Sequence, residues 1–197
     1  MVVNKEITEL ARESLQGKWN FMALVTLLYV VILGGVSVSS ILGKIGSYLF
    51  AGAMGIGYFS LTLRNARRQD TELSQLFSGF NIFLKSLLLY LLMTIFIFLW
   101  TLLLIVPGFV AMLRYSFVYL VATDEPTLSA TEIIARSKEL TYGYKWQIFC
   151  LICRFLGWFI LSLMSCGIGF FWSVPYFSQS ITQLYLEVLQ TKGEVAI

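Results

Sequence analysis

The sequence predicts an all-α integral membrane protein with six transmembrane helices arranged as three hairpins. Three observations lead to this prediction: long apolar blocks, basic residues gathered in alternate loops, and an amphipathic segment before each pair of blocks. Of 197 residues, 58% are hydrophobic and 13% are charged, whereas an ordinary soluble domain has roughly 45–50% apolar and about 25% charged residues. We therefore treat residues 1–197 as a single membrane domain.

The six apolar blocks are candidate membrane spans. About 20 residues of helix cross the hydrocarbon core, which is about 30 Å thick. Three blocks carry no charge, and they run over Phe21–Leu42, Ile45–Leu63 and Ser86–Val106. Three others contain some polar or charged residues, and they run over Phe109–Thr123, Trp146–Phe171 and Trp172–Leu189. None shows the alternation of a transmembrane β-strand, so helices are expected throughout.

Basic residues predict the orientation of these spans. If every block crosses and the chain starts inside, one side receives Lys5, Arg12, Lys18, Arg64, Arg67, Arg68, Arg136, Lys138, Lys145 and Lys192. The other side keeps only Lys44, in one of the short turns that contain glycine or proline. Because Lys and Arg gather in cytoplasmic loops, both termini are expected in the cytoplasm.

An amphipathic segment precedes each hairpin, at residues 4–16, 71–80 and 128–142. Their apolar residues recur with helical spacing, and Ser129 and Glu132 in the third form a capping-box pattern. Each segment is expected to lie as a helix along the cytoplasmic interface, roughly perpendicular to the spans, with its apolar side among lipids.

A glycine followed by an aromatic residue ends each amphipathic segment. These glycines are Gly17, Gly79 and Gly143, which recur after 62 and 64 residues. The period predicts three copies of one unit, over residues 4–68, 69–127 and 128–191. The alternative is convergence, since any bundle of hairpins places glycine and aromatic residues at the membrane boundary.

Several motifs resemble one known family. They include Leu76-Phe77-Ser78-Gly79-Phe80, Ile105-Val106-Pro107-Gly108, Asp124-Glu125-Pro126-Thr127-Leu128, Gly157-Trp158 and Gly167-Ile168-Gly169. The chain resembles a bacterial multi-pass membrane family known only as a domain of unknown function, number nine hundred and seventy-five. This resemblance implies a place in the bacterial cell membrane and no established activity. The chain is also distantly similar to the membrane domain of some glycerophosphodiester phosphodiesterases, which implies a lipid-associated setting by analogy of fold.

The residue types argue against enzymatic chemistry. The chain has no histidine, the commonest general base and metal ligand, so we expect no catalytic residue, metal or cofactor. Cys150 and Cys153 lie in an apolar block without a second pair, and we interpret them as packing residues. The small residues from Ala51 to Gly57 recur at one-turn spacing, which favours close helix packing over a permeation hinge. No basic cluster suited to nucleic acid is present.

Two arginines inside apolar blocks define the candidate binding site, since a charge in the membrane usually faces protein or water. Arg154 is expected to face the last block, whose polar residues recur along one helical face; the proposed site comprises Arg154, Arg114, Tyr176, Gln179, Ser180, Gln183 and Glu187. One interpretation is that these groups lock helices together. The other is a polar cavity for an anionic headgroup or solute, which arginine suits.

Two functional hypotheses remain. The first is a non-enzymatic accessory or scaffolding protein that acts through membrane lipids, other membrane proteins or self-association. The alternative is a small transporter or channel subunit with a polar cavity around Arg154 and the last helix. Against the alternative, the three units share one orientation, whereas many transporters pair inverted repeats.

Overall fold

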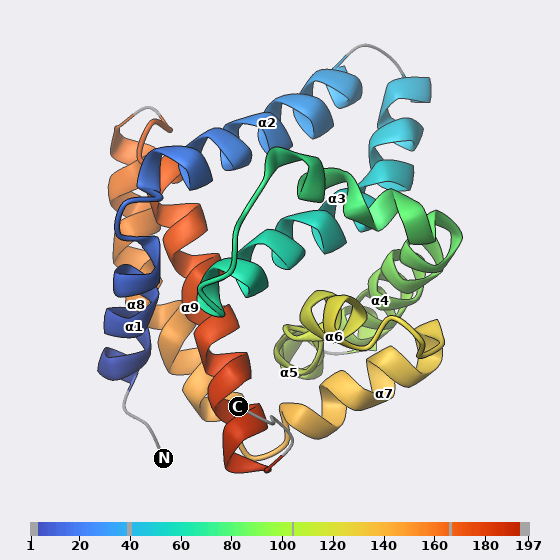
Figure 1. Ribbon diagram of the computed structural model, residues 1–197. Helices are drawn as coiled ribbons and strands as arrows, with labels where there is room; N and C mark the ends of the chain where they lie inside the picture. The colour runs from blue at the N-terminus through green and yellow to red at the C-terminus, as the bar shows by residue number, and fades with distance from the viewer. Residues whose placement is uncertain (1–3, 39–40, 104, 166, 194–197) are drawn as a thin grey trace.

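The computed structural model describes residues 4–38, 41–103, 105–165 and 167–193, and all regular elements in these ranges are helical (Figure 1). Helix α1 (Asn4–Leu15) ends at an elbow where Gly17 has φ +77°, and α2 (Trp19–Val38) leaves at 94° to it. This left-handed φ favours glycine. The first elbow is therefore confirmed.

The position of α1 corrects one expectation. It does not lie perpendicular to the third hairpin but runs beside its two helices, α8 (Lys145–Met164) and α9 (Phe170–Thr191) (Figure 1). The Asn4 side chain donates to the Gln147 carbonyl at 3.2 Å, and the Tyr176 hydroxyl donates to the Thr8 carbonyl at 3.1 Å. The apolar side of α1 is therefore covered by protein, and α2 rather than α1 crosses the direction of the hairpin.

Small residues bring α3 (Ile41–Ala66) against the next two elements, the 3-10 helix η1 (Leu73–Ile82) and α4 (Phe83–Leu103). A Cβ atom added at Gly57 would overlap the Leu76 carbonyl, and one at Gly52 would overlap the Ser86 carbonyl. The packing interpretation of this glycine-rich segment is confirmed. Gly79 packs against α3 in the same way and lies inside η1, which continues directly into α4, so the second elbow is not a separate turn.

The expected span 109–123 is wrong as a single helix. Helix α5 (Ile105–Arg114) stops within it, and α6 (Val118–Asp124) starts after a short turn. Side chains from the segment 130–141, which follows α6, supply hydrogen bonds at the interruption. The Ser137 hydroxyl donates to the Arg114 carbonyl at 2.8 Å, and the Thr141 hydroxyl donates to the same oxygen at 3.5 Å. α6 lies in the core, where Val118, Leu120 and Val121 are fully buried.

Helix α7 (Ala130–Leu140) begins at the expected capping box. The Ser129 backbone N–H donates to the Glu132 carboxylate at 2.7 Å, and the Ser129 hydroxyl accepts from the Glu132 backbone N–H at 3.4 Å. Hydrogen bonding by the Ser129 side chain and then by its backbone lowers the pKa of Glu132. α7 ends near Gly143, whose φ of +88° confirms the third elbow.

Two helices in the described ranges are long and apolar enough to cross a membrane, Leu73–Leu102 and Lys145–Met164, and a third is obtained if α1 and residues 19–34 are taken as one bent span. Large apolar side chains on α4 and α8 remain exposed, among them Leu84 (79%), Leu102 (73%) and Met164 (77%). Monomeric soluble proteins rarely expose apolar surface on this scale. The chain is therefore a helical membrane protein.

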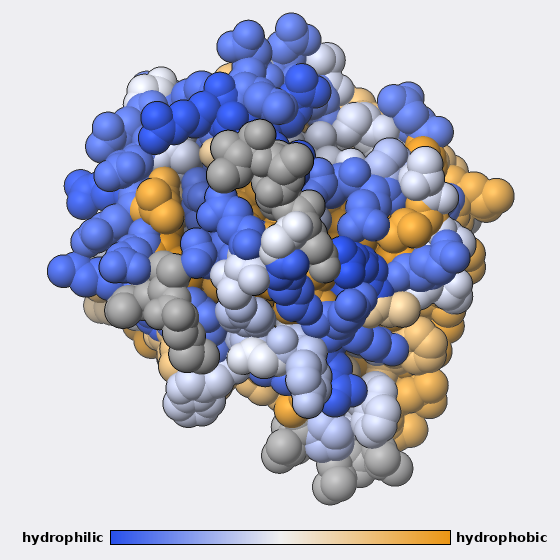
Figure 2. All heavy atoms as spheres, turned by 60° about the horizontal axis from the view of Figure 1, so that its bottom comes forward, coloured by the Kyte–Doolittle hydropathy of each residue, from blue (hydrophilic) through white to orange (hydrophobic). Residues whose placement is uncertain are grey.

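Polar and apolar side chains occupy different parts of the surface. Figure 2 shows a mainly hydrophilic face on the side where α7 and the end of α9 lie, with apolar surface gathered along one margin. On α7, the side chains of Glu132, Lys138 and Glu139 are exposed. This segregation is typical of a protein with one end in contact with water and an apolar surface along its side.

Candidate functional site

The structure does not bring the two membrane arginines together with the last helix. Arg154 lies on the exposed side of α8, and no hydrogen bond or ion pair of its side chain appears in the described ranges. The prediction that Arg154 faces Ser180, Gln183 or Glu187 is therefore wrong. Arg114 is half-buried, and its described hydrogen bonds are those that its carbonyl accepts from α7.

Gln179 instead belongs to a buried polar network between α3 and α9. Its amide donates to the Thr62 carbonyl at 3.1 Å, and its side-chain oxygen accepts from Asn65 at 3.3 Å. Asn65 also donates to the Ser14 carbonyl at 2.9 Å, while Thr182 donates to the Thr62 hydroxyl at 3.0 Å. Buried polar groups pair in this way because unpaired ones carry a desolvation cost. The network joins α1, α3 and α9.

The other predicted residues of α9 have local or separate roles. Ser180 is buried and donates to the Tyr176 carbonyl one turn earlier at 2.8 Å. Gln183 and Glu187 are half-buried. Tyr176 lines a cavity, and its ring contacts Trp19 and Phe155 at centroid distances of 5.9 and 4.9 Å.

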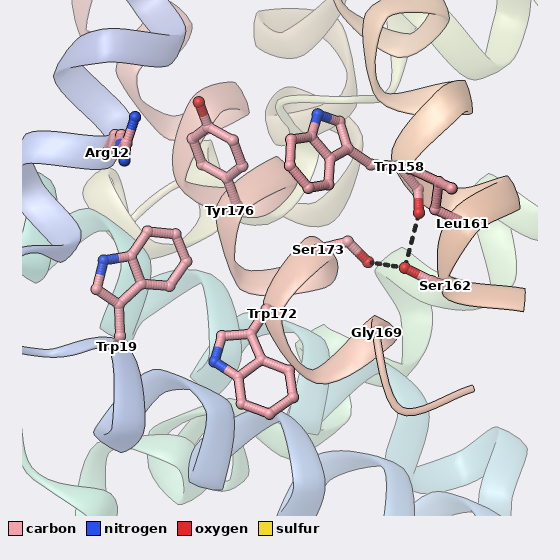
Figure 3. Close-up of a pocket in the computed structure, with 9 residues that line it drawn as sticks. All are labelled: Arg12, Trp19, Trp158, Leu161, Ser162, Gly169, Trp172, Ser173 and Tyr176. Carbon is pink, nitrogen blue, oxygen red and sulfur yellow. Dashed lines mark hydrogen bonds between the residues drawn. The ribbon is translucent and has the colours of Figure 1, made fainter. Parts of the chain in front are cut away.

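That cavity, called here the elbow pocket, has a volume of about 460 Å³ and lies where the first elbow meets the third hairpin (Figure 3). Its lining comes from α1, the start of α2, α8, the hairpin turn and α9, and consists of Arg12, Trp19, Trp158, Leu161, Ser162, Gly169, Trp172, Ser173 and Tyr176. Three tryptophan rings and the Tyr176 ring surround the space, and Arg12 lies at its margin (Figure 3). The pocket therefore combines an aromatic wall with one cation.

Close packing fixes the floor of the elbow pocket. The hydroxyls of Ser162 and Ser173 lie 3.0 Å apart and join α8 to α9. Gly169 allows this approach, because a Cβ atom there would come within 2.7 Å of Ser162. Ser162 also donates to the Trp158 carbonyl at 2.7 Å. Among the other side-chain donors of the lining, the guanidinium of Arg12 and the indole N–H groups of the tryptophans have no hydrogen-bond partner within the described ranges.

Sequence reasoning missed most of the elbow pocket. It identified the aromatic residue that follows Gly17 only as part of an elbow, it used Gly169 only within a family motif, and it treated Arg12 as an orienting charge. The tryptophans Trp158 and Trp172 on either side of the hairpin turn were the available signal, since tryptophan prefers the headgroup region of a bilayer.

A second polar cluster lies where α3, α6 and α9 end. Arg67 donates to both carboxylate oxygens of Asp124 at 2.7 and 2.9 Å, and the Tyr185 hydroxyl donates to the same carboxylate at 3.0 Å. A bidentate pair of this kind is geometrically specific. In the described ranges, no group of three or more Cys, Asp or Glu residues is arranged to hold a metal ion.

Comparisons with known proteins give one match. The model of a family described as "Protein of unknown function (DUF975)" matches residues 1–113 and 102–192. No curated protein and no solved structure matches the chain. The distant similarity to the glycerophosphodiester phosphodiesterase membrane domain therefore receives no support from these comparisons.

Proposed function

The chain belongs to the DUF975 family of proteins of unknown function, and we propose that it is a non-enzymatic membrane protein that acts through lipids or partner membrane proteins. The observation that carries this proposal is the apolar flank. Side chains at both ends of α4 and at the end of α8 are more than 70% exposed, including Leu84, Leu102, Leu163 and Met164. Lipid chains or apolar helices of a partner would cover this surface.

The interior supports the same proposal over the transport alternative. The buried amide and hydroxyl groups of Asn65, Gln179, Thr62 and Thr182 bond to one another across helices. Hydrogen bonds between helices suit a scaffold, whereas a solute pathway needs polar groups that face a water-filled cavity. Within the described ranges the Asn65 side-chain oxygen is the member of this network that is buried without a hydrogen-bond partner. Arg154, on which the transport alternative depended, is exposed and has no hydrogen bond to this network within the described ranges.

Reconstitution separates the two functions. Purified protein in vesicles of mixed phospholipids is expected to leave the vesicles impermeable to small anions and cations, and protein extracted in a membrane-active polymer is expected to retain phospholipid. Electrophysiology or dye-flux assays measure the first quantity, and lipid mass spectrometry measures the second. Selective solute flux, or complete loss of lipid on extraction, would contradict the proposal.

We propose a topology in the bacterial cell membrane with both termini in the cytoplasm. The proposal rests on the one-sided placement of basic residues. The side on which the third hairpin turns is left out of this proposal, because the elbow pocket brings Gly169 of that turn together with Arg12 and Trp19 of the first elbow.

In a variant without native cysteines, a single cysteine at Lys44 is expected to react with an impermeant reagent in intact cells, whereas those at Gln69 and Lys192 should react only after lysis. Labelling of Gln69→Cys from outside would overturn the orientation, and protection of Lys44→Cys alone would remove the first two crossings.

A further inference from the structure

We propose that the elbow pocket binds an anionic phospholipid, with the headgroup phosphate at Arg12 and the upper acyl chain along the tryptophan wall. This inference deepens the proposed function by naming the class of lipid and its site. The pocket volume of about 460 Å³ is within the range of small-molecule sites, roughly 300–1,000 Å³. It is large enough for a headgroup and the first carbons of a chain.

The charges in the elbow pocket favour an anion. Arg12 is exposed, and its side chain has no ion pair or hydrogen bond within the described ranges. None of the nine lining residues is acidic. The indole N–H groups and the guanidinium are donors only. A phosphate offers acceptor oxygens to such donors, and an arginine fork matches phosphate geometry.

The walls of the elbow pocket favour a lipid over free phosphate. Trp158, Leu161 and Trp172 line it and are 55%, 60% and 49% exposed. These residues sit on and beside α8, one of the two helices apolar enough to cross a membrane. The cavity therefore opens onto surface that lipid chains cover, and tryptophan there fits the boundary between chains and headgroups.

Similar cavities recur at the starts of the other long apolar helices. One of about 390 Å³ contains Lys85 at the start of α4, and another of about 390 Å³ contains Lys145 and Trp146 at the start of α8. Lys85 donates to the Pro126 carbonyl, and Lys145 lies 5.7 Å from the Tyr142 ring centroid. Arg12 has no comparable contact within the described ranges. Of these three cavities, the elbow pocket is therefore the one whose cation is available to bind an external anion.

The test compares two variants that each remove one positive charge from α1. Arg12→Gln removes the positive charge at the margin of the elbow pocket. Lys5→Gln removes an exposed positive charge outside the pocket, where Lys5 forms an ion pair with Glu9 at 3.9 Å. Native mass spectrometry would measure binding of phosphatidylglycerol and phosphatidylcholine to delipidated protein. We expect Arg12→Gln to weaken phosphatidylglycerol binding about tenfold, the equivalent of one hydrogen bond to a charged group, with Lys5→Gln close to wild type.

Two further variants and a competitor identify the source of the phosphate. Trp172→Ala is expected to weaken both lipids, because it removes part of the wall, and Arg12→Lys should restore part of the preference for phosphatidylglycerol. Glycerol 3-phosphate at millimolar concentration should not displace the lipid. Equal loss in Arg12→Gln and Lys5→Gln, equal affinity of wild type for the two lipids, or displacement by glycerol 3-phosphate would overturn the proposal.

Failure of this site and failure of the proposed function give different results. If the protein retains phospholipid but Arg12→Gln binds phosphatidylglycerol like wild type, the elbow pocket is not the site and the general function stands. If the protein conducts solute in vesicles while Arg12→Gln still lowers phosphatidylglycerol binding, the general function fails and the lipid site stands.

Discussion

Replacing Gly57 with alanine is expected to destabilise the protein far more than the same change at Gly55 or Gly157. A Cβ atom at Gly57 would overlap the Leu76 carbonyl of η1, and backbone cannot swing aside as a side chain can. Overpacking costs about 1–3 kcal/mol and occasionally more, and we expect a loss of about 3 kcal/mol or more. Thermal unfolding in detergent, followed by intrinsic fluorescence, would measure it.

Alanine at the other two glycines is expected to change the stability less. A Cβ atom at Gly55 would come within 3.2 Å of the Tyr119 ring, which can shift, so a smaller loss is expected. At Gly157 nothing lies within 4 Å, and alanine should be neutral or stabilising by up to about 1 kcal/mol through helix propensity. If Gly57→Ala unfolds at the same temperature as Gly157→Ala, α3 and η1 do not pack at this distance.

Local patterns in the sequence predicted the parts of the fold that local chemistry determines. The capping box at Ser129 and the glycine elbows at Gly17 and Gly143 depend only on neighbouring residues, and all three are present. The period near 63 residues wrongly assigned the same elbow role to Gly79, because spacing does not distinguish a glycine that turns from one that packs.

Long-range contacts determine what the sequence could not predict. The docking of α1 depends on the hydrogen bond from Tyr176 to Thr8, 168 residues away. The interruption after Arg114 occurs within an apolar run and depends on hydroxyl groups from α7. Hydropathy measures neither interaction, so α1 was expected at the interface and residues 109–123 were expected as one span.

The candidate site illustrates the same limit. Helical spacing correctly placed Tyr176 and Ser180 on one side of α9, but spacing does not say which helix that side meets. Gln179, which directly precedes Ser180, joins α3 instead, and Arg154 is exposed. The elbow pocket combines residues near positions 12–19 with others near 158–176, so only the docking of α1 brings its charge and its aromatic wall together.

Asp124→Asn is expected to cause the second large loss of stability. The carboxylate holds Arg67 through two hydrogen bonds and accepts a third from Tyr185. Removing one partner of a buried ion pair costs about 3–5 kcal/mol. The side chains of Arg67 and Asp124 are 34% and 18% exposed, so solvent screening reduces our expectation to about 2 kcal/mol. For a chain of this length, that corresponds to a fall in melting temperature of about 4–8 °C.

An exposed ion pair in the same protein provides the control. Glu139 is 61% exposed and contacts Arg136 at 3.0 Å, so Glu139→Gln should cost less than about 1 kcal/mol. Combining Asp124→Asn with Arg67→Gln removes the uncompensated charge, and the double variant should lose less than the sum of the two single losses. Equal small losses for Asp124→Asn and Glu139→Gln, with strict additivity in the double variant, would mean that Asp124 does not hold α3, α6 and α9 together.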